Sequence, residues 1–135
     1  MEQTYFMIKP EIVAAKEQKI GAILDQVNTC GFRILEMVVR RLSTATVEEF
    51  YAEHAGKGFY TDLVAYIASG PVVAIRLERE DAVRRLRELV GATDPAAAAT
   101  GTIRDLYGIS LQNNAVHASA NREDARRELG IIFGA

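Results

Sequence analysis

Thr4-Tyr5-Phe6-Met7-Ile8-Lys9-Pro10 (TYFMIKP) is the stretch of the sequence that decides the fold. Its first five residues are apolar, aromatic or β-branched, which is typical of a strand. Proline disfavours helix at the residue before it but is well tolerated in the first turn of a helix that follows. We therefore predict a strand that ends at Lys9 and then one helix. That helix has its apolar stripe at four residues with helical spacing: Ile20, Ile23, Leu24 and Val27.

Strands and helices continue to alternate along the rest of the chain. Further strands are expected at residues 32–42, 73–77 and 114–119, and the second of these shows the apolar–polar alternation of a half-buried strand. A capping pattern, Thr46-Val47-Glu48-Glu49, predicts the start of the next helix, and a short helix follows at residues 60–67. Glu80-Asp81 precede another helix, and Asn121 is the expected N-cap of the last one, with Ala125, Leu129 and Ile132 facing inward.

This element order predicts an α+β fold built on an antiparallel sheet. Removing the short helices after the second strand leaves βαββαβ, the ferredoxin-like pattern, with a C-terminal helix added. We expect a single domain over residues 1–135, because the sequence shows neither a repeat nor a linker. Residues 91–108 show no periodicity, and a long irregular stretch in a small domain is usually functional or disordered.

Composition excludes several classes of protein. The net charge of -2 and pI near 5.7 argue against non-specific nucleic-acid binding, which needs a clustered basic surface. No apolar stretch approaches the roughly 20 residues that a membrane span requires, and the first residues lack the pattern of a signal peptide. Cys30 is the only cysteine, and we expect it to be a small buried residue in a reducing compartment. The expected location is the cytoplasm.

Histidine is the first residue type to consider for chemistry, because the chain has only two. His54 and His117 lack a neighbouring His or Cys at i+3 or i+4, so a structural zinc or metallohydrolase site is not indicated. His54 is expected to be a surface residue. On position alone, His117 is more typical of a hydrogen-bonded core histidine, although a strand end before a helix N-terminus also suits anion chemistry.

Two arginines suggest a site for an anion. Arg87 closes a helix and Arg104 lies in the irregular segment, and a guanidinium can hold phosphate oxygens with two hydrogen bonds. Taken one at a time, both are more typical of solvated surface residues. The common phosphate loops are absent, since Gly56-Lys57-Gly58 lacks the remaining residues of a Walker motif.

Several strings together resemble the nucleoside diphosphate kinases, in family order over almost the whole chain. Besides the opening string, they are Ser69-Gly70-Pro71-Val72-Val73-Ala74, Gly91-Ala92-Thr93-Asp94-Pro95-Ala96, Gly101-Thr102-Ile103-Arg104 and Asn114-Ala115-Val116-His117-Ala118-Ser119. The resemblance implies an enzyme that transfers the terminal phosphoryl group of a nucleoside triphosphate such as ATP to a nucleoside diphosphate by ping-pong kinetics.

The resemblance also implies a role for individual residues. His117 would be the nucleophile that becomes a phosphohistidine, with Glu128 fixing its tautomer and Ser119 supporting the same network. Lys9 would reach the terminal phosphate, and Tyr51 would help to hold that lysine. The remaining expected nucleotide contacts are phosphates at Arg87, Thr93 and Arg104, base stacking at Phe59 and a sugar hydroxyl at Asn114.

Cofactor and assembly follow from the same resemblance. Mg²⁺ is expected to arrive with the nucleotide and to be held mainly by its phosphates, with no metal site of the protein's own. Stacking reads only the face of a base, so base discrimination should be loose. The implied assembly is a homo-oligomer, a hexamer or a tetramer built from dimers.

The sequence departs from the usual family pattern at two places beside the expected site. Glu11-Ile12 stand where the family usually has Asp-Gly, and Ala118-Ser119-Ala120 follow the histidine where Gly-Ser-Asp is usual. The lost acid leaves a rival hypothesis open, in which the chain is a weakly active or non-catalytic nucleotide-binding regulatory protein on the same fold. A ferredoxin-like RNA binder is not indicated, because the basic face and the paired strand aromatics are missing.

Overall fold

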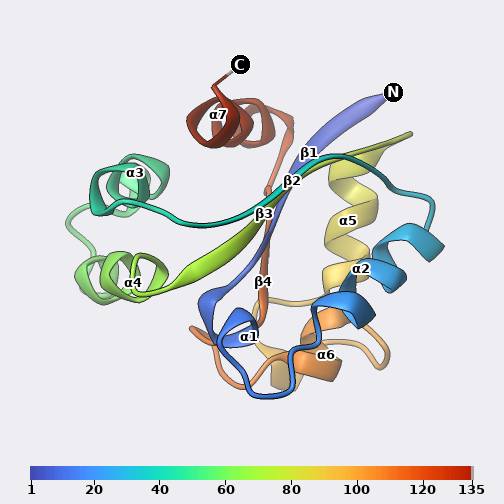
Figure 1. Cartoon of the computed structure of the whole chain (residues 1–135), viewed down its shortest axis with the longest axis horizontal. Coiled ribbons are helices and arrows are strands. Elements are labelled where there is room, and N and C mark those ends of the chain that lie inside the picture. Colours follow the sequence, from blue (N-terminus) through green and yellow to red (C-terminus); the bar gives the residue numbers. More distant parts are fainter. Residues whose placement is uncertain (135) are drawn as a thin grey trace.

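A four-stranded antiparallel sheet forms the centre of the computed structural model, which describes residues 1–134 (Figure 1). The strands are β1 (Glu2–Ile8), β2 (Arg33–Arg41), β3 (Pro71–Arg79) and β4 (Val116–Ala118), and their order across the sheet is β2-β3-β1-β4. β1 pairs with both β3 and β4, so the first and last strands of the chain lie side by side. The predicted α+β fold with a βαββαβ core is confirmed.

The helices divide between the two faces of the sheet (Figure 1). In chain order they are α1 (Pro10–Val13), α2 (Ile20–Thr29), α3 (Thr44–Phe50), α4 (Tyr60–Ile67), α5 (Ala82–Val90), α6 (Ile103–Tyr107) and α7 (Arg122–Phe133), with short 3₁₀ turns η1 (Ala52–His54) and η2 (Pro95–Ala97). The buried side chains of α2 and α5 join one core and those of α3, α4 and α7 join the other.

The alternation of side chains along β1 builds both cores at once. Phe6 and Ile8 point to the core that contains α2 and α5, whereas Tyr5 and Met7 point to the core that contains α3, α4 and α7. All four are essentially fully buried, and burial of such a side chain contributes about 1.5–3 kcal/mol. Residues 72–75 of β3 are likewise buried on both faces of the sheet. The prediction that this strand is half-buried is therefore wrong for these residues.

Two helix starts differ from the sequence prediction. The single helix expected after Pro10 is two helices, because residues 14–19 have no apolar side chain larger than alanine to hold them against the sheet and are exposed. The N-cap of α3 is Ser43 and not Thr46; the Ser43 hydroxyl accepts a hydrogen bond from the Thr46 backbone N–H. The cap predicted for α7 is confirmed, since Asn121 accepts from the backbone N–H of Asp124 at 2.7 Å.

Two further expectations need correction. Residues 91–108 are not wholly irregular, because they contain η2 and α6; at five residues, α6 is too short to show helical periodicity in the sequence. Cys30 is exposed rather than buried, since it follows the last turn of α2 and Gly31 reverses the chain there with a φ of 90°. In the part of the chain that the structure describes, no helix is long and apolar enough to cross a membrane.

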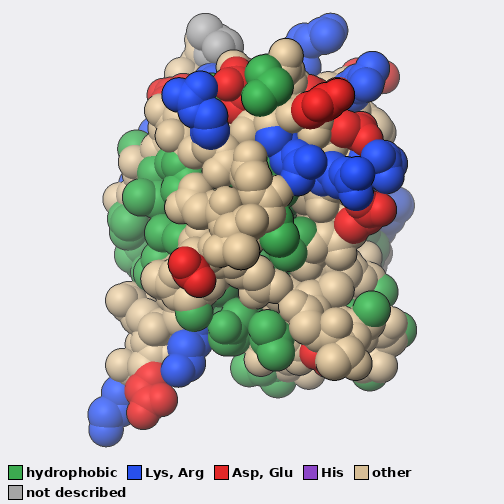
Figure 2. All heavy atoms as spheres, turned by 90° about the vertical axis from the view of Figure 1, so that its right-hand side faces the viewer, with side chains coloured by type: hydrophobic (Ala, Val, Ile, Leu, Met, Phe, Trp, Pro, Cys, Tyr) green, Lys and Arg blue, Asp and Glu red, His purple; other side chains and the backbone are tan. Residues whose placement is uncertain are grey.

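Basic side chains on the face that carries α5 are interspersed with acidic ones (Figure 2). Arg84 pairs with Asp81 and Glu88, and Arg85 also pairs with Glu88. Such exposed pairs contribute little to stability.

Candidate active site

One cavity of about 670 Å³ gathers the residues that the sequence singled out. It opens between the end of β4, the C-terminal half of α5, α6 and the α3–η1–α4 segment. Of the ten expected site residues only Ser119 does not line it; those that do are Lys9, Tyr51, Phe59, Arg87, Thr93, Arg104, Asn114, His117 and Glu128. Residues from both ends of the chain therefore meet, because β1 and β4 are neighbours in the sheet.

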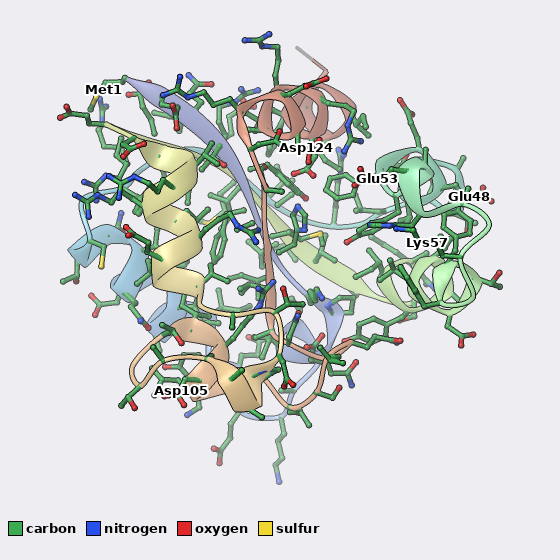
Figure 3. All side chains as sticks on the ribbon, turned by 180° about the vertical axis from the view of Figure 1, so that it is seen from behind. Met1, Glu48, Glu53, Lys57, Asp105 and Asp124 are labelled. Atoms are coloured by element: carbon green, nitrogen blue, oxygen red, sulfur yellow. The ribbon has the colours of Figure 1, made fainter. Side chains whose placement is uncertain are left out.

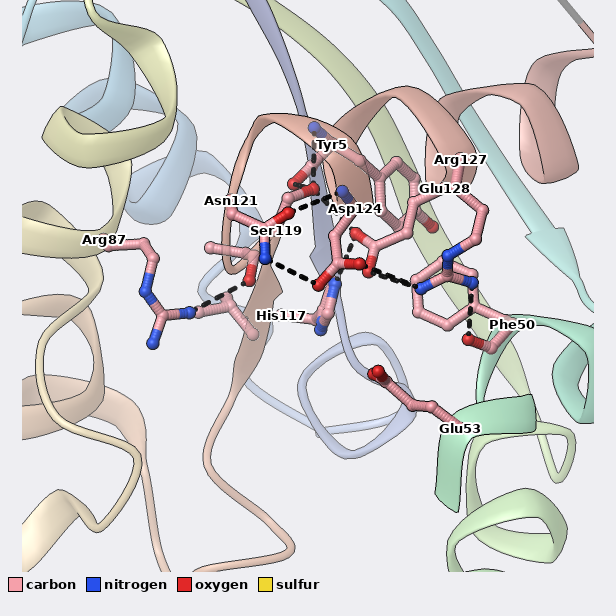
Figure 4. A network of polar contacts seen from close by, with 12 residues as sticks. Tyr5, Phe50, Glu53, Arg87, His117, Ser119, Asn121, Asp124, Arg127 and Glu128 are labelled. Atoms are coloured by element: carbon pink, nitrogen blue, oxygen red, sulfur yellow. Dashed lines mark hydrogen bonds and ion pairs between the residues drawn. The ribbon is translucent and has the colours of Figure 1, made fainter. Parts of the chain in front are cut away.

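His117 lies in the middle of β4, directly opposite Met7 of β1. Its Nε2 is 2.9 Å from Oε1 of Glu128, two turns into α7 (Figure 4). The Ser119 hydroxyl donates to the same carboxylate oxygen at 2.6 Å. Ser119 thus does not line the cavity, and it acts on the site only through its hydrogen bond to Glu128.

The protonation of this network follows from its electrostatics. Burial by itself would raise the pKa of Glu128, but the hydrogen bond and charge of His117, the Ser119 hydroxyl and Arg127 outweigh it, and the pKa is lowered. Glu128 is therefore a carboxylate at neutral pH and can only accept hydrogen bonds. Nε2 of a neutral His117 must then carry the proton, and Nδ1 keeps its lone pair.

Aromatic rings surround the imidazole of His117 and restrict its orientation. Phe50 lies edge-on with ring centroids 5.1 Å apart, and Tyr51 also lies edge-on at 6.4 Å. Tyr5 is tilted at 5.9 Å. Sequence reasoning identified Tyr51 but missed Phe50 and Tyr5, because an aromatic residue on an apolar strand or helix gives no signal beyond that of the core.

Lys9 brings a buried ammonium group to the cavity. It is 6% exposed, and its Nζ donates to Oδ1 of Asn114 at 2.6 Å and to the Gln112 carbonyl at 3.2 Å. Burial lowers the pKa of Lys9 to about 8, Glu11 opposes that shift and Arg104 adds to it. Tyr51 lines the same cavity, but the hydrogen-bond partners of the ammonium are Asn114 and Gln112.

Arg104 is fixed by backbone carbonyls. Its Nη1 donates to Gly91 at 3.2 Å and its Nη2 to Val116 at 2.9 Å, while its buried Nε has no partner in the structure. Gly91 has a φ of 90°, and a Cβ there would lie 2.5 Å from the Thr102 hydroxyl, so only glycine permits this close approach. Burial, and the nearby charge of Arg87, lower the pKa of Arg104 to about 10.

The remaining phosphate-site candidates lie around these two cations. Arg87 is exposed, and its Nη1 donates to the Ala118 carbonyl at 3.3 Å, directly beside His117. Thr93 is exposed, and its backbone carbonyl accepts a hydrogen bond from Nδ2 of Asn114 at 3.0 Å. The Asn114 amide thus binds Lys9 through its oxygen and Thr93 through its nitrogen, and each atom keeps capacity for one further hydrogen bond.

The cavity mouth is apolar on two sides. Phe59 is 50% exposed and Leu111 is 64% exposed, and both line the cavity. His54, expected at the surface, is half-buried with its ring centroid 5.3 Å from that of Phe59. Leu111 was missed by sequence reasoning, and only its place at the mouth identifies it, because exposed large apolar side chains facing one another are typical of a binding site.

Carboxylates face the cavity near the alanine that replaces the expected acid. Ala120 is exposed and lines the cavity, as do Glu53 of η1 and Asp124 of α7. Seen from behind, Glu53 and Asp124 project from two separate elements, η1 and α7 (Figure 3). Among residues 1–134 no group of three or more His, Cys, Asp or Glu side chains is placed to hold a metal ion by itself.

Comparison with known proteins identifies the family. The family model for nucleoside diphosphate kinase matches residues 2–135. The chain belongs to the nucleoside diphosphate kinase family. Its members are phosphotransferases, and a nucleoside diphosphate kinase from Chlorobium luteolum is 46% identical over 135 residues, covering 100% of this chain and 95% of that protein. The corresponding protein from Sulfolobus acidocaldarius is 43% identical over 133 residues, covering 98% and 90%.

Solved structures of the family share the fold described above. The apo nucleoside diphosphate kinase from Encephalitozoon cuniculi superposes with a TM-score of 0.95 at 32% identity, covering 100% of this chain and 90% of that one. A halophilic nucleoside diphosphate kinase from Halobacterium salinarum, solved in complex with CDP, gives a TM-score of 0.92 at 39% identity, covering 99% and 88%.

Proposed function

We propose that this chain transfers the terminal phosphoryl group of ATP to nucleoside diphosphates through a phosphohistidine at His117. The observation that carries the proposal is the contact between Nε2 of His117 and the ionised Glu128, 2.9 Å long, at the wall of a cavity that also contains Lys9 and Arg104. A fixed tautomer with a free Nδ1, next to buried cations, is a nucleophile aimed at an anionic substrate.

In the first half-reaction, Nδ1 of His117 attacks the terminal phosphorus in line with its bond to the bridging oxygen. The N–P bond forms as the P–O bond breaks, and the nucleoside diphosphate leaves with the electrons of that bond. Glu128 holds the Nε2 proton and stabilises the positive charge that develops on the ring. In the second half-reaction, a terminal oxygen of another nucleoside diphosphate attacks the phosphorus and restores the free imidazole.

Cations at the cavity wall stabilise the transferring group. Lys9, Arg87 and Arg104 come from three separate segments, and each has a donor available to phosphate oxygens at the cavity. Transfer of this kind depends on positioning and charge stabilisation rather than on proton transfer.

The residues at the cavity suit a magnesium ion that binds together with the nucleotide. The described residues contain no ligand cluster of their own, whereas Glu53 and Asp124 place carboxylate oxygens at the cavity, where they suit the water shell of a hydrated cation. Bound to the phosphates, Mg²⁺ would neutralise part of their negative charge. Asp124 stands three helix residues beyond the cap and close to Ala120, which supports an active enzyme despite that alanine.

Substrate breadth follows from the mouth of the cavity. Phe59 and Leu111 offer flat and apolar contact to a base, and neither carries a group that reads its hydrogen-bonding edge. We expect nucleoside diphosphates with different bases to be accepted at similar efficiency. The Halobacterium salinarum relative was solved in complex with CDP, which supports nucleotide binding by this chain.

Assembly is proposed from an exposed sheet edge. β2 is an edge strand with exposed apolar side chains, including Met37 at 47% and Val39 at 63%, which supports a homo-oligomer built from dimers. Analytical ultracentrifugation distinguishes monomer, dimer, tetramer and hexamer. The cytoplasm is the proposed location, in keeping with a substrate pool of nucleotides.

Labelling with [γ-³²P]ATP and Mg²⁺ tests the function. The wild-type chain should form an acid-labile, base-stable phosphoprotein that any nucleoside diphosphate discharges. His117→Ala should not label, whereas His54→Ala, which removes the only other histidine, should. A wild-type chain that binds nucleotide but never labels would favour the non-catalytic alternative, and labelling of His117→Ala would refute the assigned nucleophile.

A further inference from the structure

Ala115 adopts a backbone conformation that an alanine rarely takes. Its φ is 77°, and the Val116 N–H donates to the Asn114 carbonyl at 3.0 Å, which closes a three-residue γ-turn around it. Ala115 and Asn114 are 0% and 2% exposed. A non-glycine residue in the left-handed region persists only where the surrounding structure holds it in place.

The start of α1 holds this turn from both sides. The Lys9 backbone N–H donates to the Ala115 carbonyl at 2.9 Å, and the Ala115 N–H donates to Oε2 of Glu11 at 2.9 Å. The Glu11 carboxylate thus accepts a hydrogen bond from the buried Ala115 N–H, which has no strand carbonyl as its partner. Loss of that acceptor would leave the Ala115 N–H unpaired inside the protein, which is costly.

Tyr66 of α4 fixes the carboxylate in turn. Its hydroxyl accepts a hydrogen bond from the Glu11 backbone N–H at 3.3 Å and donates to Oε1 of Glu11. Burial, together with the hydrogen bond and charge of Glu11, raises the pKa of Tyr66, so its hydroxyl remains a donor throughout the neutral range. Glu11 is therefore held at three atoms, its N–H and both carboxylate oxygens.

We propose that Glu11 is a positioning residue for phosphoryl transfer, which acts by holding the γ-turn at Ala115. The first residue of the turn is Asn114, whose side chain binds the Lys9 ammonium at 2.6 Å. His117 directly follows the turn. Relaxation of the turn would move the phosphate-binding lysine and the nucleophile relative to each other, and a shift of that kind slows transfer more than it weakens nucleotide binding.

This inference rests on the proposed function and adds a residue that touches neither nucleotide nor histidine. Glu11 does not line the cavity, and its contacts are Ala115 and Tyr66. A purely structural role would lower the unfolding midpoint and leave the reaction of the folded enzyme unchanged. A positioning role must slow the formation of phosphohistidine in protein that is fully folded.

The experiment is a rapid-quench measurement of His117 labelling by [γ-³²P]ATP and Mg²⁺, with the affinity for ADP measured by calorimetry. Glu11→Ala should slow labelling roughly ten- to hundredfold, as expected for loss of a hydrogen bond to a charged group, and change the dissociation constant for ADP less than about threefold. Glu11→Gln keeps an oxygen acceptor for the Ala115 N–H and should recover most of the rate.

The decisive readout is rescue by glycine. Gly populates positive φ without strain, so Ala115→Gly added to Glu11→Ala should restore labelling to within roughly threefold of wild type. Glu17→Ala is the control, because Glu17 is exposed in the segment between α1 and α2. If Glu11→Ala does not fold, Tyr66→Phe replaces it. Its labelling should be slower by roughly three- to tenfold, because it removes both hydrogen bonds between the Tyr66 hydroxyl and Glu11 but leaves the contact of Glu11 with the Ala115 N–H.

Three results would overturn three different parts of the proposal. Folded Glu11→Ala, or Tyr66→Phe in its place, that labels within twofold of wild type overturns the positioning role and leaves the proposed function intact. A double variant that stays as slow as Glu11→Ala overturns the γ-turn as the route of the effect. A wild-type chain that never labels overturns the proposed function, and the role of Glu11 with it.

Discussion

Replacing Glu128 by glutamine removes the charge behind His117 while keeping its shape. The carboxylate accepts from Nε2 of His117 at 2.9 Å and from the Ser119 hydroxyl at 2.6 Å. A glutamine amide can present its oxygen to the same two donors, so the tautomer of His117 is preserved. The variant thus isolates the contribution of the negative charge to the transition state, in which positive charge develops on the imidazole.

The expected effect follows from the strength of the two kinds of hydrogen bond. A bond to a charged group contributes about 1.5–3 kcal/mol, and a neutral one about 0.5–1.5 kcal/mol. Their difference, about 1–1.5 kcal/mol, corresponds to a roughly tenfold slower phosphorylation of His117. Glu128→Ala should be slower by at least about a hundredfold, because it also leaves the imidazole and Ser119 without their acceptor.

Single-turnover labelling by [γ-³²P]ATP measures this rate directly. Glu123→Gln is the matched control, since Glu123 lies in the first turn of the same helix, is exposed and does not line the cavity; its rate should equal that of wild type. If Glu128→Gln labels within twofold of wild type, the carboxylate does not stabilise the developing charge. If it labels as slowly as Glu128→Ala, orientation and not charge is the whole contribution.

Three further predictions concern the cavity. The pKa of Lys9 is lowered to about 8. Because only the charged form of Lys9 holds phosphate, kcat/KM should fall as the pH rises through about 8. A profile of kcat/KM from pH 6 to 10 checks this, and the Lys9→Arg variant should lack that alkaline decline. Arg104→Lys should lower kcat/KM by roughly tenfold or more in steady-state assays, because one ammonium cannot hydrogen-bond the Gly91 and Val116 carbonyls and phosphate together. An unchanged kcat/KM would show that the guanidinium group of Arg104 is not needed to hold the phosphate. Phe59→Ala should raise KM by roughly tenfold for GDP, CDP and UDP alike with little change in kcat, and an effect confined to one base would contradict simple stacking.

The order of strands and helices was largely predictable from the sequence. The TYFMIKP string predicted where β1 ends and α1 begins, and the caps and alternation predicted β3, α5 and α7. The α3 start at Ser43 and the exposure of Cys30 were wrong, because single-residue placement at an element end depends on local geometry that composition does not specify. The short α6 was missed because one turn of helix carries no period.

The candidate site was predicted mainly through resemblance to the family. From the residues alone, His117 was more typical of a core histidine, and the two arginines were more typical of solvated surface residues. The structure brings these residues to one cavity and supplies what no motif indicated: the aromatic rings around His117, Leu111 at the mouth, and Glu11 behind Ala115. These contacts join residues far apart in the sequence; Glu11 and Ala115, for example, are 104 positions apart.

The sequence by itself determined the elements and the chemical types available: alternating apolar residues, caps, one histidine in an apolar strand, and arginines in two separate segments. It did so because strand and helix periods are local properties of the chain. Only the tertiary structure decided that β1 and β4 are neighbours, which places Lys9 and His117 at the same cavity, and that Nε2 of His117 contacts Glu128. Proton position, pKa and nucleophilicity depend on distances between such remote groups, and those distances exist only once the chain has packed.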